Sequence, residues 1–332
     1  MDQRTKAAMA EALAATGILR LGEAFARAQG SLVFALHRVL PAAEMAECYN
    51  PHLALTPESL DAFLNWVKPR YQIVSVVELL SSEKPVCCIT FDDGWEDNFR
   101  IAFPILQKHR APATIFLATG LINTNSLLPE ERLWRVWQSG MKGGRQSDVF
   151  RGFGSGEALS YGDAQARFKR LPMQAKSELI NRLEQTVSPE KPKRPSFMTW
   201  EQVRTMSAAG IGFGSHSVRH TTLAVEVESV IRQELKDSLA TLQENIKREH
   251  RYLAYPNGSH DERVVRLAQE LGYKGAFTTR RGRMKPEAPR FTLPRIPLDN
   301  LVVNSAVGRF SEARMRLHVL RESWPASPEF EY

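Results

Sequence analysis

The stretch of sequence that decides the fold reads Ile89-Thr90-Phe91-Asp92-Asp93-Gly94-Trp95. In it an apolar strand leads directly into two adjacent carboxylates and a glycine. In α/β folds the carboxyl ends of the strands form the edge where sites are built, so this order places both acids in a candidate site. An Asp-Gly pair after a strand is also an ordinary turn signal, and the string alone leaves both interpretations open.

Short β-rich runs alternate with helical stretches from Ser31 onwards, which is the pattern of an α/β fold with a largely parallel sheet. The predicted strands cover residues 32–36, 73–77, 86–91, 113–118, 211–214, 252–255 and 275–278. Two predicted helices begin at recognisable N-cap signals: Thr56 followed by Pro57 opens residues 58–68, and Thr199 with Gln202 opens the helix over 199–210. A third covers residues 226–247. The last of them is expected to be the longest, because it has helical spacing of apolar residues and no Gly or Pro.

The alternation stops between about residues 123 and 195, where no strand is predicted. We interpret this segment as a mainly helical insertion in an α/β domain spanning 31–310, and we expect substrate specificity to lie there. Trp134 and Trp137 have two interpretations, stacking on the rings of a bound substrate or core packing at helical spacing.

Residues 1–30 are predicted to be an N-terminal amphipathic helix over 4–29, and residues 311–332 a C-terminal tail with one short helix. The first helix either packs on its own domain or contacts a membrane face or a partner. Asp2 and Glu11 argue against an export signal, and no stretch approaches the length of a membrane span. These features predict a cytoplasmic protein, with a position at the inner face of the membrane as the alternative.

The composition excludes several classes of protein. With 332 residues, of which 43% are apolar, the chain has enough apolar residues to form a hydrophobic core. This composition excludes disorder and collagen-like fibres. The 44 basic and 37 acidic residues give a net charge of +7, which permits nucleic-acid binding without requiring it. Cys48 and the adjacent pair Cys87 and Cys88 form neither a disulfide framework nor a CxxC metal site, and a reducing compartment is expected.

A second string with chemical meaning is Gly214-Ser215-His216-Ser217-Val218-Arg219-His220. Two histidines at i and i+4 can face one direction on a helical turn and hold one divalent ion, with a carboxylate as third ligand. Taken alone, such a pair is more often two unrelated surface histidines. Together with the Asp-Asp strand end it matches a hydrolytic metal centre, with the spare Asp free to accept the proton of water.

Two further strings are less specific, namely Leu253-Ala254-Tyr255-Pro256-Asn257-Gly258 and Leu293-Pro294-Arg295-Ile296-Pro297. The first follows a predicted strand, and an ordinary turn explains it as well as a site does. The string at 293–297 is interpreted as structural rather than as part of a site.

The strings at 90–94, 216–220 and 254–258, in this order, resemble the motifs of the polysaccharide deacetylases with NodB homology, the fourth family of carbohydrate esterases. Residues 34–39 are similar to the Tyr-His-Arg-Val strand that opens many members, and residues 71–80 resemble another of their segments. The resemblance covers about 31–122 and 196–300.

This resemblance implies a deformed (β/α) barrel of about seven strands. Asp93, His216 and His220 would bind a divalent ion, with Zn²⁺ expected first and Co²⁺ or Ni²⁺ as alternatives. Asp92 would be the general base that takes a proton from water at the metal, and the water would attack the carbonyl carbon of an N-acetyl group. The metal and a backbone N–H near Tyr255 would stabilise the oxyanion.

The chain departs from the family pattern at two places. Members often carry an Arg in the third motif, where this chain has Ala254, and a late His that protonates the leaving amine, which residues 293–298 lack. His37, at the end of the first strand, is either an active-site residue or a structural one. Arg295 is expected either to anchor the substrate or to orient Asp92.

The sequence thus predicts a metal-dependent hydrolase that removes N-acetyl or similar acyl groups from an amino-sugar-containing glycan or glycolipid precursor of the cell envelope. One alternative is a catalytically impaired carbohydrate-binding protein of the same fold. Another is the same metal chemistry on a different amide. The net positive charge is then explained by anionic glycan or membrane-surface partners, and no nucleic-acid partner is expected.

Overall fold

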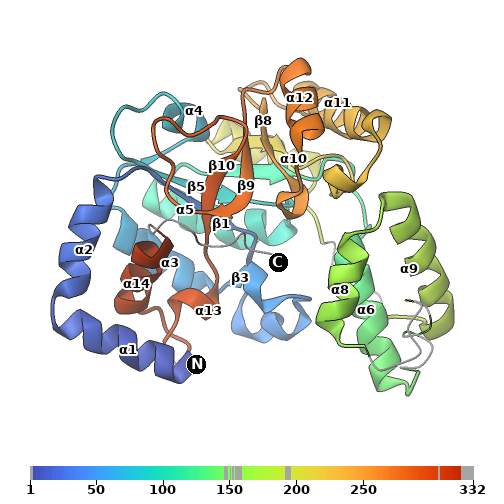
Figure 1. Cartoon of the computed structure of the whole chain (residues 1–332), viewed down its shortest axis with the longest axis horizontal. Coiled ribbons are helices and arrows are strands. Elements are labelled where there is room, and N and C mark those ends of the chain that lie inside the picture. Colours follow the sequence, from blue (N-terminus) through green and yellow to red (C-terminus); the bar gives the residue numbers. More distant parts are fainter. Residues whose placement is uncertain are drawn as a thin grey trace.

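Parallel β-strands form a closed barrel in the computed structural model, which describes residues 3–145, 149, 151, 153, 159–190, 196–305 and 307–322 (Figure 1). Each strand is hydrogen-bonded to the next, and the last pairs with the first. Around the barrel the order is β1 (Leu32–Leu36), β10 (Leu293–Pro297), β9 (Gly275–Arg281), β8 (Tyr252–Ala254), β7 (Gly212–Ser215), β6 (Thr114–Leu117) and β5 (Cys87–Phe91). The predicted seven-stranded (β/α) barrel is confirmed.

Strand β10 is not among the predicted strands, and it contains Pro294 and Pro297, a residue type that is rare inside a sheet. The structure accommodates Pro294 at a break in register, since β10 shifts against β9 between Leu293 and Arg295. The missing N–H of Pro294 therefore lies at an irregular point of the ladder. On its other side β10 pairs with β1 and closes the barrel.

The predicted strand at residues 73–77 is wrong beyond Val74, where β4 (Ile73–Val74) ends. Ser75 and Glu78 form a reciprocal capping box, so the chain turns into the helix α4 (Val76–Leu79). Strand β4 pairs with Cys87 and Cys88 of β5, on the side that β6 occupies further along that strand.

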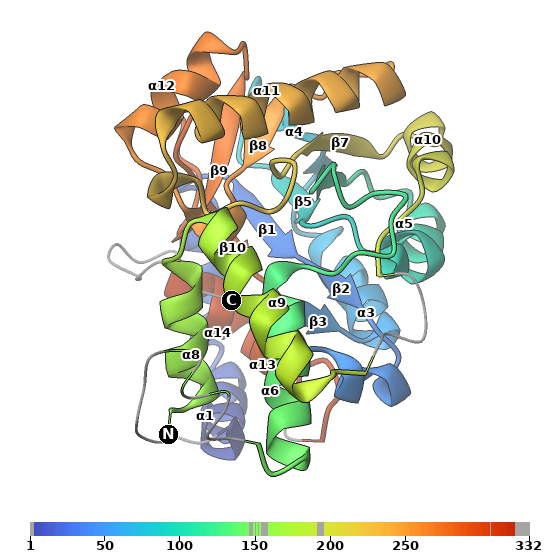
Figure 2. The same ribbon diagram turned by 90° about the vertical axis from the view of Figure 1, so that its right-hand side faces the viewer.

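Helices cover the outside of the barrel (Figures 1 and 2). The helix starts predicted at Thr56 and Thr199 are confirmed, because each hydroxyl accepts a backbone N–H three residues on. The main helices of this layer are α3 (Pro57–Val67), α5 (Phe103–His109), α10 (Trp200–Ala208), α11 (Glu228–Asn245) and α12 (Glu262–Glu270). As predicted, α11 is the longest helix in the described part of the chain.

Short elements complete the layer. They are β2 (Arg38–Val39), β3 (Ala54–Leu55), α13 (Asn300–Val303), the π-helical turn η3 (Asn98–Ala102) and the 3₁₀ turns η1 (Ala42–Glu47), η2 (Pro51–Leu53), η4 (Leu223–Val225) and η5 (Pro256–Gly258).

The insertion folds into the helices α6 (Pro129–Lys142), α8 (Tyr161–Lys169) and α9 (Met173–Val187), which stand together on one side of the barrel (Figures 1 and 2). They enclose a small apolar core of their own. Trp137 is buried in it, with its ring 5.7 Å from that of Tyr161, whereas Trp134 packs against the barrel core. These contacts favour the packing interpretation of both tryptophans.

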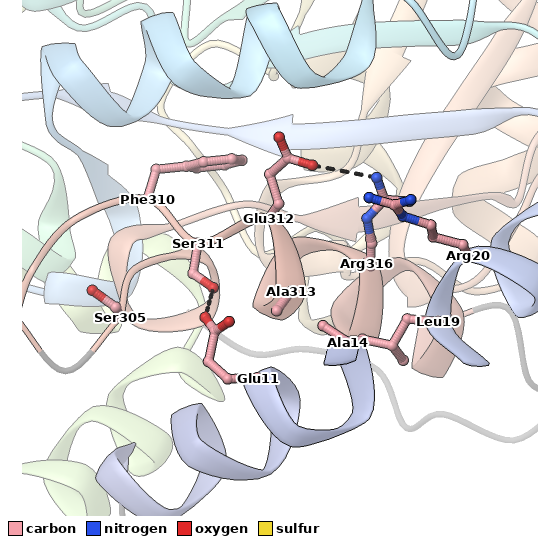
Figure 3. Close-up of a pocket in the computed structure, with 10 residues that line it drawn as sticks. All are labelled: Glu11, Ala14, Leu19, Arg20, Ser305, Phe310, Ser311, Glu312, Ala313 and Arg316. Atoms are coloured by element: carbon pink, nitrogen blue, oxygen red, sulfur yellow. Dashed lines mark hydrogen bonds and ion pairs between the residues drawn. The ribbon is translucent and has the colours of Figure 1, made fainter. Parts of the chain in front are cut away.

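The N-terminal segment forms two helices rather than the single predicted one. Helix α1 (Gln3–Ala15) ends before Gly17, whose positive φ of 77° turns the chain into α2 (Ile18–Arg27). The Ser311 hydroxyl, which precedes α14 (Glu312–Glu322), donates to the carboxylate of Glu11 at 2.7 Å (Figure 3).

Helix α14 belongs to the body of the fold, because its Met315 and Val319 lie in the barrel core. The predicted tail therefore begins with a core helix, and residues 323–332 lie outside the described residues. A cavity of about 460 Å³ lies between α1, α2 and α14 (Figure 3). Within the described residues, every helix is too short or too polar to span a membrane.

Candidate active site

A small buried cavity lies at the carboxyl edge of the barrel, where several predicted site residues meet. Its volume of about 20 Å³ suffices for about one water molecule. It is lined by His37, Tyr49, Leu53, Asp92, Asp93, Glu130, His216, His220, Tyr255, Asn257, Thr279 and Arg295. All seven residues predicted from the sequence are thus brought together.

The Asp-Asp-Gly turn after β5 separates the two carboxylates. Asp93 and Gly94 both have left-handed backbone, with φ of 74° and 87°. A Cβ at Gly94 would lie 2.7 Å from a methyl carbon of Leu117, so glycine is required there. The turn sends Asp92 toward Arg295 and Asp93 toward the two histidines.

Asp93, His216 and His220 form a cluster with the geometry of a metal site. The Oδ1 atom of Asp93 lies 3.4 Å from Nε2 of His216 and 3.5 Å from Nε2 of His220. Donor atoms held tetrahedrally at about 2.0–2.1 Å from one zinc ion lie about 3.3 Å apart. That Oδ1 atom is buried without a hydrogen-bond partner, while the Trp95 indole N–H donates to Oδ2 at 2.8 Å. The donor set and its spacing therefore fit a divalent ion.

The electrostatics of these ligands agree with that fit. Burial lowers the pKa of His216 to about 3, so its ring is neutral at pH 7. The ring nitrogen Nδ1 of His216 lies 2.7 Å from the carbonyl of Ala254, which directs Nε2 into the cluster. Burial raises the pKa of Asp93 to about 6, although His220 opposes this shift. A buried carboxylate of this kind is stabilised by a nearby cation.

The two histidines are presented by a tight loop rather than by the expected helical turn. Ser217 and His220 both have left-handed backbone, with φ of 61° and 58°. The buried carboxylate of Glu234 in α11 accepts the backbone N–H groups of Val218 at 2.9 Å and Arg219 at 3.0 Å. Strained backbone of this kind persists only where its surroundings hold it, and it is concentrated at functional sites.

Asp92 is held by Arg295, which is completely buried in β10. The two guanidinium Nη atoms donate to the two carboxylate oxygens at 2.8 and 2.7 Å, and Nε donates to the carbonyl of Thr278 at 3.1 Å. Burial alone would raise the pKa of Asp92, but Arg295, together with His216 and His37, holds that pKa below its ordinary value. The geometry supports the orienting role of Arg295, in a chain whose third motif carries Ala254 instead of an arginine.

His37 lies in the cavity with its Nε2 atom 3.9 Å from Oδ2 of Asp92. The loop that carries it is fixed, because the Asn98 side chain donates to the carbonyl of His37 at 2.7 Å. Asp97 also accepts the backbone N–H of Val39 at 2.7 Å. Burial lowers the pKa of His37 to about 4. The structure thus places His37 beside the expected base.

The backbone N–H and the side-chain hydroxyl of Tyr255 both have partners outside the cavity. Its backbone N–H donates to the carbonyl of Phe277 and its hydroxyl to that of Phe291, each at 3.0 Å. The N–H and hydroxyl of Tyr255 itself are thus already used, and a neighbouring backbone N–H as oxyanion donor stays a prediction. Asn257, two residues further along the same loop, has a left-handed backbone with φ of 54° and lines the cavity.

Glu130 is a cavity residue that the sequence analysis missed. It lies in the first turn of α6, with Oε2 3.4 Å from Nδ1 of His220. Acidic residues are common in the first turn of any helix, so its sequence context gives no signal of a site.

Comparisons with known proteins identify a family and similar folds. The family model described as "Polysaccharide deacetylase" matches residues 80–276. The Bacillus subtilis (strain 168) protein named "Putative polysaccharide deacetylase YxkH" is 20% identical over 269 residues, which are 79% of this chain and 71% of that protein.

Solved structures resemble the fold. The Streptococcus pyogenes deacetylase PplD, in complex with acetate, is 21% identical and superposes with a TM-score of 0.56, covering 90% of this chain and 98% of the other. IcaB from Ammonifex degensii is 16% identical with a TM-score of 0.57, covering 90% and 99%.

Proposed function

The chain belongs to the polysaccharide deacetylase family, and on this premise we propose that it removes N-acetyl groups from an amino-sugar-containing glycan or glycolipid precursor of the cell envelope, with the help of a divalent metal ion. The observation that carries the proposal is the buried cluster of Asp93, His216 and His220 beside Asp92. The similar Streptococcus pyogenes deacetylase binds acetate, the acid product of this reaction.

Asp93, His216 and His220 would hold the ion, proposed to be Zn²⁺, with Co²⁺ or Ni²⁺ able to replace it. When bound, the ion supplies a Lewis acid that acidifies water and polarises the acyl carbonyl. Asp92 is the general base, because Arg295 keeps its carboxylate ionised and fixes its two oxygens.

The proton that Asp92 accepts must reach the amine that leaves. His37 stands beside Asp92, and its lowered pKa leaves the ring neutral at pH 7, so it can accept a proton and then release it. As the C–N bond breaks, His37 gives that proton to the nitrogen, and the products are acetate and the free amine. His37 thereby takes the role of the missing late histidine.

Acetate release from a panel of N-acetylated oligosaccharides and glycolipids, with the protein loaded with Zn²⁺, tests the function directly. We expect acetate from at least one of these glycans, and loss of both activity and stoichiometric zinc in His216→Ala. His109→Ala is the control, since His109 is also buried beside an aspartate, Asp61, but lies outside the cavity. Absence of acetate from every glycan, despite bound zinc, would favour the binding-only alternative.

The role of His37 predicts a loss that depends on the leaving group. In His37→Gln we expect kcat for the amide substrate to fall about 10²-fold, the lower end of the usual contribution of a general acid. Hydrolysis of an aryl acetate should fall much less, because a phenolate leaves without being protonated. Rates on the two substrates, measured together with zinc affinity, check this, and His109→Gln is the control. An equal loss on both substrates would assign His37 a structural role.

A further inference from the structure

Two buried charged residues connect the helical insertion to the metal ligand His220. Glu130 of α6 is 2% exposed, and its Oε2 atom lies 3.4 Å from Nδ1 of His220. Lys176 of α9 is 1% exposed, and its Nζ atom lies 3.6 Å from Oε1 of Glu130. Since charged side chains are rarely buried without a partner, this arrangement needs an explanation.

We propose that Glu130 is a positioning residue for His220, so that the insertion completes the metal centre. This inference rests on the metal site of the proposed function. With Nε2 of His220 directed at Asp93, the proton of a neutral ring lies on Nδ1 and needs an acceptor. The Oε2 atom of Glu130 lies 3.4 Å from Nδ1, and both atoms are buried without any other hydrogen-bond partner among the described residues, so each is available to the other.

The two histidine ligands are therefore held by different parts of the chain. Nδ1 of His216 is beside the backbone carbonyl of Ala254, which ends barrel strand β8. Nδ1 of His220 faces a side chain of the insertion. A carboxylate partner makes an imidazole a stronger ligand and fixes its ring, and losing such a partner typically weakens metal binding 10–100-fold.

Lys176 supports this arrangement from helix α9 of the insertion. Its ammonium lies beside Glu130, which offsets the cost of burying that carboxylate, and it donates to the Thr222 hydroxyl at 2.8 Å. The first residue of α9, Met173, donates its backbone N–H to the carboxylate of Glu226 at 2.6 Å. The insertion therefore docks on the segment that directly follows His220.

The test is metal affinity in Glu130→Gln, compared with Glu131→Gln. Glu131 is the next residue of the same helical turn and is equally buried, but it pairs with Arg135 at 3.0 Å instead of contacting His220. Zinc affinity is measured by competition with a chromophoric chelator, and the ligand geometry by the absorption spectrum of the Co²⁺ form. We expect zinc to bind 10–100-fold more weakly in Glu130→Gln, with a changed Co²⁺ spectrum, and no change in Glu131→Gln.

Equal affinity and an unchanged spectrum in Glu130→Gln would overturn the inference while leaving the proposed function intact. Failure of the unsubstituted protein to bind zinc or Co²⁺ would overturn both. If Glu130→Gln does not fold, Glu130→Asp retains the charge but shortens its reach. Weaker binding with a changed spectrum in that variant supports positioning, and unchanged binding refutes it.

Discussion

Replacing Asp92 with asparagine is expected to lower kcat for acetate release by about 10²–10⁴-fold while zinc still binds. The amide cannot accept a proton from water, but it occupies the same volume beside Arg295. The proposed ligands are Asp93, His216 and His220, which lie close to one another. The ion should therefore remain without the carboxylate of Asp92. Single-turnover rates and zinc stoichiometry, measured on the same preparations, separate the two effects.

Asp299→Asn is the matched control for this variant. Asp299 is also buried, but it caps α13 and lies outside the cavity. Its substitution should reduce stability and leave the chemical step unchanged. A near-normal rate in Asp92→Asn would refute the assignment of the base. Loss of zinc in that variant would instead place Asp92 among the ligands.

The parts of the site that were predictable from sequence are those encoded next to one another in the chain. Asp92 and Asp93 end a strand, and His216 and His220 lie in one loop, so each string carries its own local signal. Because parallel strands present their carboxyl ends at one edge, knowing the fold was enough to expect these strings to meet.

The remaining contacts depend on how distant segments pack. Arg295 is a candidate from the sequence, but its pairing with Asp92 depends on strand β10, which is not among the predicted strands. Glu130 resembles an ordinary helix-start acid, and only the docking of α6 on the barrel brings it to His220. Pairing of residues 90 or more positions apart leaves no periodic or local pattern in a single sequence.

Replacing Arg295 with methionine is the second substitution with a large expected effect. The change leaves Asp92 buried and without its cation, and breaking a buried pair in this way typically costs about 3–5 kcal/mol of folding free energy. In the unsubstituted protein the folded pKa of Asp92 is depressed, so this stabilisation is present above the unfolded pKa and is lost as the pH falls through the folded pKa. Urea denaturation at pH 7 measures the loss, which should be smaller in the double variant with Asp92→Asn.

The same substitution should change the pH dependence of activity. Without Arg295, the strongest of the charges that lower the pKa of Asp92 is lost while burial still raises that pKa, so the base is ionised only at higher pH. The acidic limb of kcat/KM is therefore expected to move upward by about 1–3 pH units. Arg283→Met is the control, because Arg283 is a buried arginine that donates to the carbonyl of Gly30 and lies outside the cavity. An unmoved acidic limb in Arg295→Met would mean that the arginine only supports the fold, and that the ionisation of Asp92 does not depend on it.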